Sequence, residues 1–145
     1  MAPIDRPLVC IVTPALADAN NGNWQTAQRW ARMIGGHYRV AVSTHWPDAS
    51  IPEKPAVLIA LHARRSAASI DAWARADPAA PLVVVLTGTD LYRDIADHAD
   101  AQRSIAQAHR LVVLQERGPS ALPEALRRKC RVVFQSGPSR MAVPK

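Results

Sequence analysis

The stretch that decides the fold is Leu82-Val83-Val84-Val85-Leu86-Thr87-Gly88-Thr89-Asp90-Leu91-Tyr92-Arg93-Asp94. Its first five residues are apolar and rich in valine, which is typical of a parallel strand buried on both faces. Gly88 lets the backbone turn sharply or approach a ligand, and Thr89 or Asp90 can cap a helical turn. Open α/β sheets bind ligands outside the carboxyl ends of such strands. The segment 87–93 is therefore either the floor of a site or a tight strand-to-helix turn with polar caps.

The rest of the chain repeats the alternation of strand and helix. Five more apolar or alternating runs predict strands at 8–13, 38–43, 56–61, 111–114 and 131–134. Helical spacing predicts helices over 24–34 after an N-cap at Asn23, after a cap at Ser66, over 100–109 and over 120–129. This order predicts an α/β fold: a doubly wound, Rossmann-like parallel sheet of about six strands, with the first strand near its middle.

The chain of 145 residues is basic, with a net charge of +6 carried by 15 Arg and 3 Lys. Arginine suits bidentate recognition of phosphate-like anions, but a GC-rich genome also replaces lysine with arginine without functional meaning. The arginines are scattered and no basic run interleaves with aromatic residues, so we expect no nucleic-acid partner. No apolar run approaches the length of a membrane span, so we expect no membrane-spanning segment.

Cys10 and Cys130 both lie in apolar, strand-like runs. They are typical of buried small hydrophobes in a reducing cytosol rather than of a disulfide or a metal pair. The start of the chain lacks the apolar region of a signal peptide, which also favours a cytoplasmic location. No Cys/His cluster has metal-ligand spacing and no serine nucleophile elbow is present, so we predict no metal and no cofactor.

A polar loop over 15–23 separates the first strand from the first helix. The free N–H groups and the dipole of a helix N-terminus favour an anion at such a loop, so Gly22 and Asn23 are candidate ligand-binding residues. The loop matches neither the dinucleotide fingerprint nor the phosphate-binding loop of nucleotide hydrolases. A plain strand-to-helix loop is the alternative interpretation.

The carboxyl ends of parallel strands lie at one edge of a sheet, and this edge is expected to gather the polar residues that follow each strand. The set looks built for an oxyanion or a phosphorylated molecule. The predicted binding residues are Gly22, Asn23, Arg64, Arg65, Thr87, Gly88, Thr89, Arg93 and Gln115.

Two residues of this edge are candidates for catalysis. His62 can act as a general base or donate a hydrogen bond to a phosphate, and the alternative is a satisfied structural histidine. Asp90 is the carboxylate nearest a strand end, and it can either take part in chemistry or orient an Arg or His. Arg64 and Arg65 can instead form a solvated face of the following helix.

Four motifs in this order resemble the selenosugar synthases of selenoneine biosynthesis, which are glycosyltransferases of the GT-B type related to group-4 glycosyltransferases. The motifs are Gly22-Asn23-Trp24-Gln25-Thr26-Ala27-Gln28-Arg29-Trp30-Ala31-Arg32, Leu61-His62-Ala63-Arg64-Arg65-Ser66, Leu86-Thr87-Gly88-Thr89-Asp90-Leu91-Tyr92-Arg93-Asp94 and Leu111-Val112-Val113-Leu114-Gln115. Each motif alone is weakly specific, and the resemblance extends over nearly the whole chain up to residue 136.

The resemblance implies a reaction in which selenophosphate attacks the anomeric carbon of a UDP-sugar, UDP leaves, phosphate is lost and a selenosugar results. The N-terminal domain of a GT-B enzyme normally holds the acceptor, here a small phosphate analogue. A complete GT-B enzyme has a second, similar domain for the donor and is roughly twice this length. We therefore expect an acceptor domain over 1–138, a tail or truncated interdomain linker over 139–145, and no donor domain.

Two other functions fit the same residues. The chain can be a non-catalytic Rossmann-like domain that binds a phosphorylated ligand, which the missing donor half favours. It can also be a truncated remnant of the glycosyltransferase that still folds. The selenophosphate acceptor, the UDP-sugar donor and glycosyl transfer itself are thus expectations that rest on the resemblance.

Overall fold

A computed structural model describes residues 6–14, 22–86, 95–114, 120 and 122–133 of the chain. Within them the strands are β1 (Leu8–Val12), β2 (Arg39–Ser43), β3 (Val57–Leu61), β4 (Leu82–Leu86), β5 (Arg110–Val113) and β6 (Cys130–Val132). The helices are α2 (Gly22–Ile34), α3 (Ala67–Ala76), α4 (Ile95–Asp97), α5 (Ala99–Gln107) and α6 (Glu124–Arg127). The predicted alternation of strand and helix is confirmed.

The six strands form one parallel sheet in the order β2-β1-β3-β4-β5-β6. This confirms the predicted doubly wound, Rossmann-like α/β fold. The expected central place of the first strand is wrong, because β3 and β4 hold the middle and β1 lies one strand from the edge. The sequence of β1 does not indicate its place in the sheet. All five of its residues are buried, as they would also be in a central strand.

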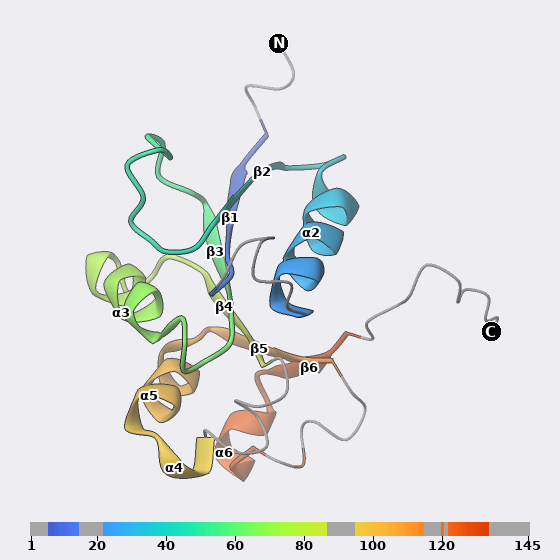
Figure 1. The fold of residues 1–145 in the computed structure, drawn as a ribbon. Helices are drawn as coiled ribbons and strands as arrows, with labels where there is room; N and C mark the ends of the chain where they lie inside the picture. The colour runs from blue at the N-terminus through green and yellow to red at the C-terminus, as the bar shows by residue number, and fades with distance from the viewer. Residues whose placement is uncertain (1–5, 15–21, 87–94, 115–119, 121, 134–145) are drawn as a thin grey trace, which may run out of the picture.

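The sheet separates two apolar layers, because alternate residues of each strand point to opposite faces. One layer packs against α3 and α5 and includes Leu58, Val84 and Leu111. The other packs against α2 and includes Ile11 and Val85. Figure 1 shows α2 on one side of the sheet and α3 and α5 on the other. The sheet is thus covered on two sides, as a parallel sheet requires.

The connection from β2 to β3 spans residues 44–56 and contains no helix. Trp46 anchors it: its ring meets that of Trp73 edge-to-face at a centroid distance of 5.0 Å and an interplanar angle of 74°. The Trp46 N–H donates to Ser69 Oγ at 3.0 Å, and the Trp73 indole donates to Ala80 O at 3.3 Å. Aromatic packing on α3 thus covers the core where a helix would otherwise lie.

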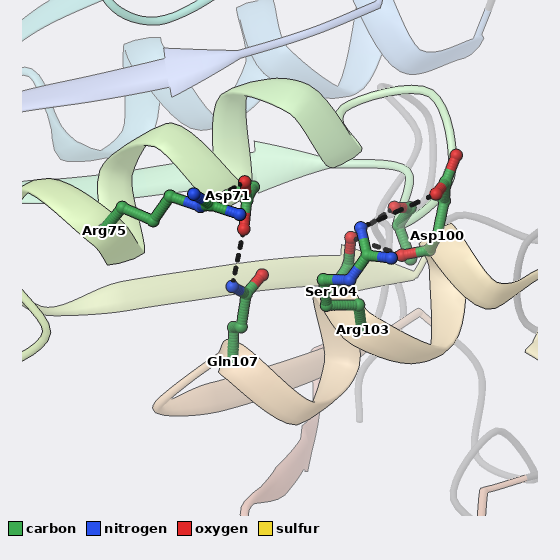
Figure 2. A network of polar contacts seen from close by, with 7 residues as sticks. Asp71, Arg75, Asp100, Arg103, Ser104 and Gln107 are labelled. Atoms are coloured by element: carbon green, nitrogen blue, oxygen red, sulfur yellow. Dashed lines mark hydrogen bonds and ion pairs between the residues drawn. The ribbon is translucent and has the colours of Figure 1, made fainter.

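Polar contacts also join α3 to α5. Gln107 Nε2 donates to Asp71 Oδ1 at 3.0 Å, and Arg75 Nε lies 2.8 Å from Asp71 Oδ2 (Figure 2). The hydrogen bond from Gln107 is the main reason why the pKa of Asp71 lies below its ordinary value.

None of the helices described is long and apolar enough to span a lipid bilayer.

Candidate functional site

The strand order places the topological switch point of the sheet next to His62. The chain leaves β1 toward β2 on one side and leaves β3 toward β4 on the other, so the winding direction changes between β1 and β3. Ligands of open α/β sheets bind at such a switch point, outside the carboxyl ends of the strands. The turn 62–65 follows β3 directly, and α2 begins after β1. The candidate site therefore lies between this turn and the first turn of α2.

His62 has an unusual backbone. Its φ of 78° is the one positive value among the non-glycine residues that the structure describes, and the residue is only 6% exposed. The His62 N–H donates to Val85 O at 2.9 Å, which ties the turn to β4. A left-handed conformation is disfavoured for residues with a Cβ, and such residues are often found at functional sites. The predicted site residue His62 thus occupies a strained position at the switch point.

The His62 ring has a defined orientation. The backbone N–H of Arg65 donates to His62 Nδ1 at 3.1 Å. Because Nδ1 accepts this hydrogen bond, the neutral ring carries its proton on Nε2. In this tautomer Nε2 donates a hydrogen bond and does not accept a proton. This tautomer is compatible with the predicted donor role of His62 and with the alternative of a satisfied structural histidine.

Two serine hydroxyls hold the turn. Ser66 Oγ donates to Leu61 O at 2.5 Å, and Ser104 Oγ of α5 lies 2.7 Å from Ala63 O. Ser104 Oγ also lies 3.0 Å from Asp100 O, so its single hydrogen can serve either carbonyl (Figure 2). Ser66 is the N-cap residue of α3, as predicted, but its side chain makes no capping hydrogen bond. The hydroxyl turns back to the strand end because a buried carbonyl needs a donor.

Arg64 and Arg65 are both exposed on this turn. Their positions between the buried residues Ala63 and Ser66 leave two guanidinium groups at the carboxyl edge of the sheet, one strand from β1. Arginine at such a place suits a phosphate-like anion. The backbone of Arg65 has its own task, since its N–H orients the His62 ring.

Helix α2 begins at Gly22, so Asn23 lies inside its first turn rather than at the predicted cap. Asparagine stands at 20, 21 and 23, and the capping preference alone does not choose among them. The first-turn N–H groups of a helix have no partner within it and favour negative charge. The backbone of Gly22 and Asn23 thus brings a partial positive charge to the carboxyl edge.

Several predicted site residues lie outside the described residues. They are Thr87, Gly88, Thr89, Asp90, Arg93 and Gln115. The structure therefore brings together His62, Arg64, Arg65 and the start of α2, and the second catalytic candidate, Asp90, stays a prediction.

Sequence reasoning missed two buried hydroxyls at this edge. Thr13 follows β1, is fully buried, and donates its N–H to Ser43 O at 2.9 Å. Ser104 stands three residues after Ala101 on the inner face of α5, and that helical spacing could have identified it as buried. In both cases the sequence places a polar residue at a position that faces the core, and this pattern could have identified the buried hydroxyl.

The two cysteines are free thiols and both are buried, as predicted. Burial, with a smaller contribution from the charge of Asp48, raises the pKa of Cys10 to about 11. Burial also raises the pKa of Cys130. Neutral thiols are poor nucleophiles and metal ligands, so these residues act as core side chains. Within the described ranges, no three residues among His, Cys, Asp and Glu form a group that could hold a metal ion.

No protein-family model matches this chain, and a search of curated proteins finds no significant match.

Proposed function

We propose that this chain is the acceptor-binding half of a glycosyltransferase that transfers a sugar from a UDP-sugar to selenophosphate. The proposal rests on the four motifs that resemble selenosugar synthases. The observation that carries it is the buried His62 with its positive φ, held at the switch point beside two exposed arginines. A strained, oriented donor next to two guanidinium groups supports binding of a small phosphate analogue.

The residues have distinct tasks in this proposal. Arg64 and Arg65 supply the charge that holds the phosphate oxygens, and the His62 Nε2–H donates to one of them. The first turn of α2 adds its N–H groups to the same anion. Selenium then forms a bond to the anomeric carbon of the donor while the bond from that carbon to UDP breaks. Addition of water to phosphorus later breaks the P–Se bond, which releases phosphate and leaves the selenosugar.

Anaerobic calorimetric titration of the purified chain with selenophosphate tests the proposal. We expect binding that weakens about tenfold in Arg64→Ala, because a charge-assisted hydrogen bond is lost. Arg75→Ala is the matched control, since Arg75 lies at the opposite end of α3 and pairs with Asp71. Absence of selenophosphate binding by the folded chain, or equal binding by both variants, contradicts the proposal.

A second pair of variants tests the donor role of His62. The amide of His62→Gln can donate from a similar distance, whereas His62→Leu has no donor. We expect His62→Gln to bind selenophosphate more tightly than His62→Leu, with circular dichroism confirming that both variants fold. Equal loss in both variants would remove the Nε2–H from the proposed site.

A further inference from the structure

A basic hollow lies at the amino edge of the sheet. It has a volume of about 550 Å³, and its polar lining comes from Arg6, Gln28, Arg32, Tyr38 and Arg39. Arg6 precedes β1, Arg39 begins β2, and Arg32 belongs to the last turn of α2. Because the strands are parallel, these residues lie at the amino edge, away from the turn 62–65. The hollow is therefore separate from the candidate site described above.

Two of the three arginines that line the hollow make contacts within the protein that stabilise the fold. Arg39 makes a bidentate pair with Glu53 at 2.7 and 2.6 Å, and its Nε donates to Arg6 O at 2.9 Å. Arg6 Nη1 lies 3.1 Å from Gly36 O and 3.4 Å from Gly35 O. Arg6 thus offsets the negative end of α2, which would otherwise repel an anion. The electrostatic cost of placing an anion at a helix C-terminus is reduced here.

Arg32 differs from the other two arginines. It is exposed, and it makes no hydrogen bond or ion pair within the part of the chain that the structure describes. Gln28 lies one turn earlier on the same side of α2, and its amide can donate and accept. Tyr38 also lines the hollow and is 41% exposed, so part of its ring is accessible to a ligand.

We propose that this hollow binds a nucleotide, with the phosphates against Arg32 and the base against the ring of Tyr38. A guanidinium, an aromatic face and an amide are the groups that recognise a phosphate, a flat ring and its polar edge. The volume is within the range of small-molecule sites. The hollow would bind its nucleotide independently of any acceptor at His62.

The test is a titration of the full chain, labelled with ¹⁵N, with ADP, followed by amide chemical shifts. We expect shifts at Arg32, Gly35, Gly36 and Tyr38, and binding about tenfold weaker in Arg32→Gln. Arg29→Gln is the matched control, because it removes the same charge from the same helix outside the lining of the hollow. Adenosine and pyrophosphate, titrated separately, should each bind more weakly than ADP.

The outcomes separate this site from the proposed acceptor site. Loss of ADP binding in Arg32→Gln, with binding retained in Arg29→Gln and Arg64→Ala, supports the hollow. No ADP-dependent shifts in the folded chain, or equal effects of Arg32→Gln and Arg29→Gln, overturn it. An ADP affinity that falls in Arg64→Ala but not in Arg32→Gln also overturns it, because the nucleotide would then bind at the carboxyl edge.

Discussion

Asp48 is the carboxylate with the most complete hydrogen bonding among the residues described. Ser43 Oγ donates to it at 2.5 Å, and the N–H and hydroxyl of Ser50 donate at 2.9 and 2.8 Å. These contacts, led by that from Ser43, lower the pKa of Asp48 from 3.8 to about 2. Hydrogen bonds to the charged form thus fasten the start of the connection 44–56 to the end of β2.

The pH dependence of stability should reveal this contact. Because the folded-state pKa is depressed, the contribution of Asp48 is fully present above about pH 4 and is lost as the pH falls toward 2. We expect Asp48→Asn to lower the urea midpoint at pH 7, and the difference from the parent chain to shrink below pH 4. Asp97→Asn, at the end of α4, is the control. A difference that stays constant with pH would contradict the argument.

The sequence predicts the structural environment of some residues but not of others. Leu58, Val84 and Leu111 follow from the apolar period of their strands, and all three are buried. The positive φ of His62 could not be predicted, because histidine has no strong preference for that conformation and the turn is held by contacts from Ser104, far along the chain. The roles of the site residues depend on such tertiary contacts, which local pattern does not contain.

One buried hydroxyl joins α5 to the turn after β3. Ser104 bridges α5 to the turn after β3, whereas the neighbouring Arg103 is exposed and lies 3.7 Å from Asp100. We expect Ser104→Ala to lower the free energy of unfolding by about 1 kcal/mol, because a buried hydrogen bond is removed. Arg103→Ala should change it by less than about 0.5 kcal/mol. Urea titrations of both variants measure these values, and equal effects would contradict the assigned role of Ser104.

Elements were predicted better than their ends. The predicted strand 111–114 is found at Arg110–Val113, and the predicted helix 120–129 is confined to Glu124–Arg127 after Pro123. A proline fixes its own φ and donates no hydrogen bond, so a helix readily begins after it. The run of apolar residues indicated each strand, but the ladder of hydrogen bonds with its neighbours decides where the strand stops.

We expect the order of strands to determine which parts of the sheet open first. β3 and β4 each have a strand on both sides, whereas β2 and β6 have one neighbour in the described sheet. We expect native-state hydrogen exchange to be slowest for the amides of β3 and β4, such as Ala60 and Val84, and faster for β2 and β6. Exchange of β6 as slow as that of β4 would show that the sheet does not open from its edges. The strand order itself was beyond the sequence, since it is set by crossovers between distant segments.

The edge-to-face pair of Trp46 and Trp73 has an optical consequence. Two indole chromophores held this close and at a fixed angle couple their transition dipoles, and the coupling gives a paired positive and negative band in circular dichroism. This signal depends on the 44–56 connection resting on α3, not on the helices or the sheet as such. The chain therefore carries an internal reporter that distinguishes release of this connection from global unfolding without any added label.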